Sequence, residues 1–119
     1  RSKLPGFQEP WGGPSHEYAV PEHTQEALTH YLLNGWEPGG FVSAMLAMDL
    51  ERALYNGDVV NKNHLWSIGR WICEYAPAGS WGNYELIKSW CRDDDGRRTA
   101  YAKEIEQAFI MKTLKEGVE

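Results

Sequence analysis

The sequence predicts an all-α fold: a compact bundle of about five helices with an irregular N-terminal arm. Apolar side chains recur at spacings of three and four residues, as on one face of a helix. Asn-Gly pairs and prolines divide these segments, and no useful length of chain alternates between apolar and polar residues as a strand would. The 119 residues favour a single domain, and a 13% aromatic content excludes a wholly disordered chain.

The first half of the chain is predicted to hold the arm and two helices. Residues 1–20 are expected to form the arm and residues 21–119 the helical domain, because prolines and glycines crowd the first segment. The first helix should begin near Pro21 or Thr24 and end at Asn34-Gly35. The strongly apolar segment from Phe41 to Leu54 is expected to be one central helix, packed on several sides.

The second half is predicted to hold three helices. The third should run from about Asp58 or Asn61 to Tyr75, and the fourth should begin at Ser80 or Asn83. An acidic run follows the fourth helix and is expected to be a solvated loop. The last helix is expected over residues 99–115 with Thr99 as its N-cap. Further expectations are a buried stripe on the third helix and two buried thiols: Leu65, Trp66, Ile68, Trp71, Ile72, Tyr75, Cys73 and Cys91.

The charge is distributed unevenly along the chain. The net charge is −5, and between Leu4 and Glu51 there are seven acidic residues and no Lys or Arg. Such a surface repels nucleic acid and anionic lipid and attracts a basic protein surface. The candidate partner-binding residues combine exposed acids with aromatic anchors: Glu22, Glu26, Glu37, Asp49, Glu51, Trp11 and Trp36. The alternative is that the acidic residues only keep the protein dispersed.

No catalytic or metal-binding motif is present in the sequence. His23 and His30 are two helical turns apart, no Cys-x-x-Cys occurs, and Asp49 and Glu51 cannot share a helix face. We therefore expect no metal, no cofactor and no enzymatic activity, with a cryptic enzyme as an alternative. No apolar stretch approaches the ~20 residues of a membrane span, and no signal peptide is visible, so a cytoplasmic protein is expected.

Two corners combine glycines with aromatic residues. Gly39, Gly40 and Phe41 form one, and Trp81 and Gly82 form the other. Open backbone N–H groups and a stacking Trp could hold a phosphorylated nucleotide if the two corners met in space. The alternatives are a tight turn whose glycines adopt conformations closed to other residues, and a Trp that fills a gap between helices.

A series of short motifs resembles a family of small proteins encoded by many bacteriophage genomes. The motifs are Pro21-Glu22-His23-Thr24, Tyr31, Pro38-Gly39-Gly40-Phe41, Asp49-Leu50, Asn61, Trp71-Ile72, Ala76-Pro77 and Ser80-Trp81-Gly82. The resemblance covers about 60% of the chain, from Pro21 to about Trp90. It implies a phage origin and assigns no catalytic residue.

A phage origin and an acidic surface together favour one function. The chain is predicted to be a non-catalytic accessory protein that binds and inhibits a host protein in the host cytoplasm, as an anti-defence or host-takeover factor. Alternatives are a sponge for a small phosphorylated signalling nucleotide and a cryptic enzyme. The Trp-rich helical faces could also support a homodimer.

Overall fold

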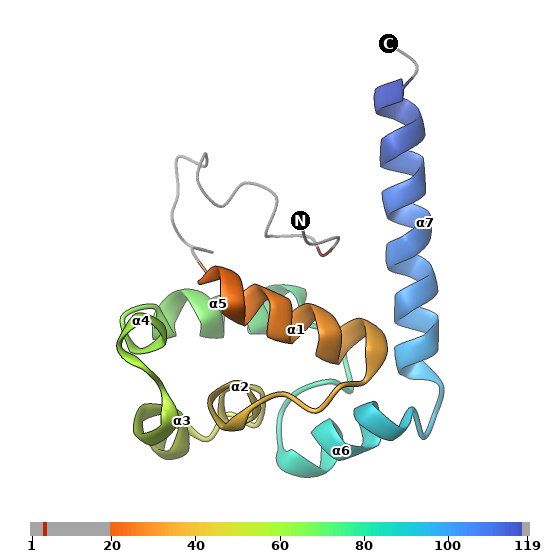
Figure 1. Ribbon diagram of the computed structural model, residues 1–119. Helices are drawn as coiled ribbons and strands as arrows, with labels where there is room; N and C mark the ends of the chain where they lie inside the picture. The colour runs from red at the N-terminus through yellow and green to blue at the C-terminus, as the bar shows by residue number, and fades with distance from the viewer. Residues whose placement is uncertain (1–3, 5–19, 118–119) are drawn as a thin grey trace.

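The computed structural model describes Leu4 and residues 20–117 (Figure 1). This part of the chain contains no strand, so the predicted all-α class is confirmed. The predicted count of about five helices is wrong, because two of the expected helices are each broken in two. The helices are α1 (Glu22–Asn34), α2 (Gly40–Leu46), α3 (Leu50–Asn56), α4 (Val59–Lys62), α5 (Leu65–Tyr75), α6 (Tyr84–Arg92) and α7 (Arg97–Gly117).

The predicted first helix is confirmed as α1. Thr24, Leu28, Tyr31 and Leu32 are its buried residues. The helix ends at Gly35, which adopts a left-handed conformation with φ of 74°. A Cβ at this position would lie 2.9 Å from the carbonyl oxygen of Cys91, so both the backbone angle and the close approach of another segment call for glycine. The predicted arm lies outside the described residues apart from Leu4 and Val20, which are buried.

The single central helix expected from Phe41 to Leu54 is broken between α2 and α3. Met48 adopts a left-handed conformation with φ of 62°. Its N–H donates to the Met45 oxygen while that of Asp49 donates to the Ala44 oxygen, the hydrogen-bond pattern of a Schellman motif. Asp49 then caps α3 by accepting a bond from the Arg52 N–H. Only α2 is packed on several sides, against α1, α3, α5 and α6.

The expected third helix is likewise broken, into α4 and α5. Asp58 caps α4 by accepting a bond from the Asn61 N–H at 2.7 Å, and α5 begins after His64. Most of the expected stripe on α5 packs against the core, with Ile68, Trp71 and Ile72 buried. Trp66 is 62% exposed and is not part of the core, against the prediction.

The helices after Tyr75 follow the predicted positions, with two corrections. Asn83 caps α6 by accepting a bond from the Leu86 N–H. Thr99 is not the N-cap of the last helix, because α7 begins at Arg97 and the Asp93 carboxylate accepts the N–H groups of Arg98 and Thr99. The prediction of two buried thiols is wrong for both: Cys73 is exposed and Cys91 is half-buried.

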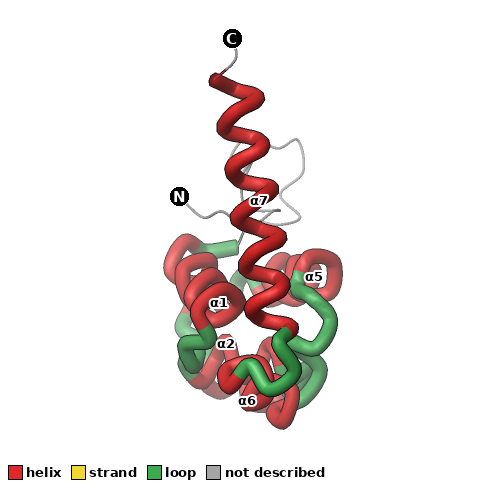
Figure 2. The backbone as a smooth tube through the Cα atoms, turned by 90° about the vertical axis from the view of Figure 1, so that its right-hand side faces the viewer, coloured by secondary structure: helices red, strands yellow, loops and turns green. Residues whose placement is uncertain are grey.

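The core lies where α1, α2, α5 and α6 meet, and long-range hydrogen bonds join these elements. The Tyr31 hydroxyl donates to the Ser80 carbonyl at 2.7 Å, and the Trp90 indole donates to the Leu32 carbonyl at 3.3 Å. The first part of α7 packs on α1 and α6, while its second part extends away from the other helices (Figures 1 and 2). No helix among the described residues has both the length and the apolar character needed to cross a membrane.

Candidate functional site

The five acidic candidates differ in their surroundings. Glu22, Glu26, Glu37 and Glu51 are exposed, as a docking role requires. Asp49 is half-buried, accepts a 2.8 Å bond from the Tyr84 hydroxyl and caps α3. The bond from Tyr84, followed by that from the Arg52 backbone, lowers the pKa of the Asp49 carboxyl below 3.8. Asp49 therefore carries its charge at neutral pH, but it uses that charge to join α3 to α6.

The exposed acids do not gather at one point. Glu22 and Glu26 occupy the first part of α1, and α1 rises about 18 Å before the loop that carries Glu37. Glu37 lies near α6, since its carboxylate adds to the effect of burial in raising the pKa of the Cys91 thiol. Glu51 is on α3. The acidic surface is therefore spread over several elements.

Of the two predicted aromatic anchors, only Trp36 lies among the described residues. Trp36 is 60% exposed and stacks on the His30 ring with a centroid separation of 4.4 Å. Trp11 lies outside the described residues. Trp36 and Glu37 are neighbours beyond the end of α1, on the opposite end of that helix from Glu22.

A hydrogen-bonded cluster joins the start of α1 to α4. The buried Thr24 hydroxyl donates to Asn61 Oδ1, and this bond orients the amide so that Asn61 Nδ2 faces His23 Nε2 at 3.2 Å. His23 Nε2 also lies 3.6 Å from an Asp58 carboxylate oxygen. The cluster fixes the start of α1 beside α4. The sequence held no local signal for this pairing, because 37 residues separate Thr24 from Asn61.

The two Gly–aromatic corners lie at opposite ends of α2. Gly39 is the N-cap of this seven-residue helix, whereas the Gly82 N–H donates to the carbonyl of Leu46, its last residue, at 2.7 Å. About 10 Å of helix separates the two corners. Gly39 has a φ of −66° and Gly40 is helical, so neither adopts the left-handed conformation considered for this turn. Phe41 is buried and Trp81 packs against the core.

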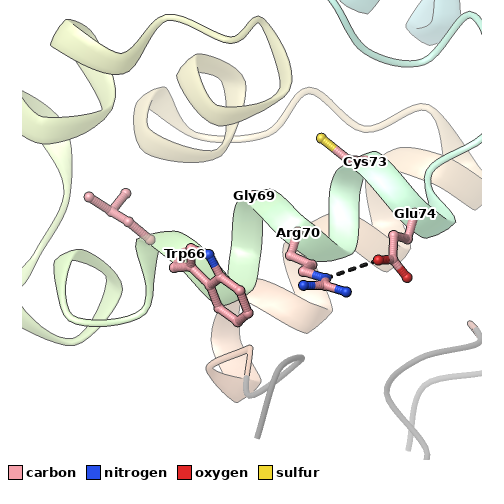
Figure 3. Close-up of a pocket in the computed structure, with 6 residues that line it drawn as sticks. Trp66, Gly69, Arg70, Cys73 and Glu74 are labelled. Carbon is pink, nitrogen blue, oxygen red and sulfur yellow. Dashed lines mark hydrogen bonds and ion pairs between the residues drawn. The ribbon is translucent and has the colours of Figure 1, made fainter.

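A shallow groove of about 440 Å³ runs along the outer face of α5 (Figure 3). The Arg70 guanidinium lies 5.3 Å from the Trp66 ring centroid and forms a 2.9 Å ion pair with Glu74. The residues that line the groove are Leu65, Trp66, Gly69, Arg70, Cys73 and Glu74. Its two charged side chains, Arg70 and Glu74, pair with each other, and the rest of its lining is mostly apolar.

Sequence reasoning missed a set of apolar side chains on α3 and α4. They are exposed over 45% to 88% of their surface. We call this set the α3–α4 apolar surface: Leu50, Leu54, Tyr55, Val59 and Val60. The sequence does hold a signal for this surface: Asn56-Gly57 and Asn63 follow these two segments closely, so each helix is short. A short helix cannot bury all of its sides.

The described residues contain no group of three or more His, Cys, Asp and Glu side chains placed to hold a metal ion. No known protein family matches the sequence, and no curated protein or solved structure is detectably similar to it. The functional argument therefore depends on the chain's own surface.

Proposed function

We propose that this chain is a non-catalytic binding protein that attaches to a basic surface on another protein and blocks it. The observation that carries the proposal is the absence of Lys and Arg between Leu4 and Glu51, combined with the exposure of Glu22, Glu26, Glu37 and Glu51. Exposed carboxylates along a stretch that holds no Lys or Arg give a negative field that accelerates encounter with a positive partner.

The kind of target follows from the same chemistry. A basic protein surface commonly serves to hold nucleic acid, and an acidic protein that covers it competes with the phosphate backbone. The resemblance to small bacteriophage proteins favours a bacterial host protein as the target, in a defence complex or in an enzyme that the phage redirects. The proposal therefore includes inhibition of that host protein in its cytoplasm.

A salt-controlled capture experiment tests the proposal. The immobilised full chain is incubated with bacterial lysate at low and at high salt, beside the variant Glu22→Lys/Glu26→Lys. We expect one stoichiometric protein that is retained at low salt, released at high salt and lost from the variant. The matched control is Glu104→Lys/Glu106→Lys, which changes the net charge equally at two exposed positions of α7 and should retain the partner.

Two outcomes would contradict the proposal. A captured protein that stays bound at high salt and also binds Glu22→Lys/Glu26→Lys would show that the acidic surface does not steer binding. A nucleotide that is freed from the purified chain only by heat denaturation would favour a small-ligand sponge. The placement of the two Gly–aromatic corners at opposite ends of α2 gives that alternative no added support.

A further inference from the structure

The second part of α7 presents apolar side chains to solvent. In Figures 1 and 2 this part of the helix extends beyond the other helices, and α7 packs on α1 and α6 through its first part. Leu114 follows Ile110 by four residues and Met111 by three, so the three side chains share one face of the helix. We call it the α7 apolar face: Ile110 is 48% exposed, Met111 68% and Leu114 61%.

The α7 apolar face is turned away from the core. Among the residues of α7, Ile105 is buried and Tyr101 packs edge-on against Trp90 of α6. At 3.6 residues per turn, the α7 apolar face lies about 150° around the helix axis from these two residues. An exposed apolar face on a projecting helix is typical of an interaction site.

The charges along this segment indicate what covers the face, because the sequence is complementary to its own reverse. When residues 103–116 are aligned antiparallel with a second copy, about a centre between Phe109 and Ile110, every charge lies opposite a residue of the other sign or a neutral one. The pairs that include a charge are Lys103 with Glu116, Glu104 with Lys115, Glu106 with Thr113 and Lys112 with Gln107. A parallel alignment would instead place each charge beside its own copy, and like charges repel.

Helix geometry brings the best of these pairs to one edge. Positions 104 and 115 are separated by about three full turns, so they have nearly the same angular position on α7. That edge borders the α7 apolar face, and Glu104 is exposed there. In a contact with two-fold symmetry the same edge of each copy meets, which places Glu104 of one copy opposite Lys115 of the other twice over.

We propose that the second part of α7 pairs antiparallel with the same segment of a second copy of this chain. The two α7 apolar faces form the centre of the contact, and the Glu104 and Lys115 pairs lie along its edge. The apolar centre supplies the attraction, and the charges select the antiparallel orientation. This dimer is independent of the proposed function.

Sedimentation equilibrium of the full chain over a dilution series tests the dimer. The contact is small, so we expect a dimer at high protein concentration that dissociates on dilution. Ile110→Gln/Leu114→Gln should raise its dissociation constant at least about tenfold, because it removes the apolar centre while keeping good helix formers in α7. The matched control is Leu50→Gln/Leu54→Gln, which changes an equally spaced and comparably exposed pair on α3 and should leave the dimer intact.

Exchange of charges tests the antiparallel orientation in the same measurement. Glu104→Lys should raise the dissociation constant, because it places two lysines opposite each other in both halves of the contact. Glu104→Lys/Lys115→Glu reverses both members of the pair and should restore dimerisation. A dimer that Glu104→Lys leaves unchanged, or that the double exchange does not restore, would overturn the antiparallel pairing.

Two further results would overturn the dimer itself. One is a chain that stays monomeric at the highest soluble concentration. The other is a dimer that Ile110→Gln/Leu114→Gln retains or that Leu50→Gln/Leu54→Gln loses. Urea unfolding of each variant, at a dilution where the unmodified chain is monomeric, should give an unchanged midpoint. If the midpoint of Ile110→Gln/Leu114→Gln falls, the charge exchange at exposed Glu104 decides the question.

Discussion

The interior of the helical assembly and its α3–α4 edge use the same residue types in opposite ways. In the interior, Tyr31 and Trp71 are fully buried. At the edge, Tyr55 of α3 is 88% exposed, and on the outside of α5 Trp66 is 62% exposed. The interior holds its aromatics through distant partners, such as the bond from Tyr31 to the Ser80 carbonyl 49 residues away. Whether an aromatic side chain packs or is presented therefore depends on a remote segment, not on its neighbours in the sequence.

The largest expected difference between the two regions is in the effect of truncating a Trp. Trp71→Ala should lower the free energy of unfolding by about 3 to 5 kcal/mol, because it empties a fully enclosed site. Trp66→Ala, five positions earlier in the same helix α5 and largely exposed, should change it by no more than about 0.5 kcal/mol. Urea unfolding followed by circular dichroism measures both. Similar losses in the two variants would remove the distinction between interior and edge.

A smaller difference is expected when only a hydroxyl is removed. Tyr31→Phe leaves the Ser80 carbonyl without its donor inside the core, at a cost of about 1 to 3 kcal/mol. Tyr55→Phe removes a hydroxyl from an exposed ring and should leave stability unchanged. The same urea titration compares them, and an unchanged midpoint for Tyr31→Phe would mean that the buried bond contributes nothing.

Much of the fold could be predicted from the sequence because many helix boundaries are local. The end of α1 and the start of α6 are each marked by a residue at the helix terminus itself, Gly35 and Asn83. The break at Met48 combines local bonds, those of the Schellman motif and the Asp49 cap, with bonds to a distant segment. It is stabilised by the bond of Gly82 to Leu46 and by that of Tyr84 to Asp49, which join segments about 35 residues apart. Periodicity alone therefore predicted one helix where there are two.

The candidate site could also be predicted only in part, where the property depends on the residue itself and not on a distant segment. Four acids predicted from charge alone are exposed, because isolated carboxylates rarely enter a core. The fixed role of Asp49 and the exposure of Tyr55 could not be foreseen, since both depend on how α3 is placed. A short helix that is anchored through its caps can present apolar residues which a longer helix would bury.

The contact that anchors the edge to the interior should be sensitive to acid. The pKa of Asp49 is lowered in the folded protein by the hydrogen bond from Tyr84 and the cap bond from Arg52. The resulting stabilisation is fully present above the unfolded value near 3.8 and is lost as the pH falls through the lower folded pKa. Asp49→Asn should therefore be less stable than the unmodified chain at pH 7, and the gap should narrow below pH 3.8. Thermal unfolding across this range measures the gap, and a constant gap would contradict the linkage.

The smallest expected effect concerns an aromatic residue whose burial is intermediate between those of the interior and the edge. Tyr101 of α7 packs edge-on against Trp90, and among the described residues its hydroxyl is the one buried side-chain polar atom without a hydrogen-bond partner. Burial raises the pKa of this hydroxyl well above its ordinary value. Tyr101→Phe removes an unsatisfied polar atom and keeps the ring, so stability should stay constant or rise by up to about 1 kcal/mol. Urea unfolding beside Tyr31→Phe gives the sign, since the two variants lose the same hydroxyl from partnered and unpartnered positions. A loss in Tyr101→Phe as large as that in Tyr31→Phe would show that the Tyr101 hydroxyl has a partner in solution.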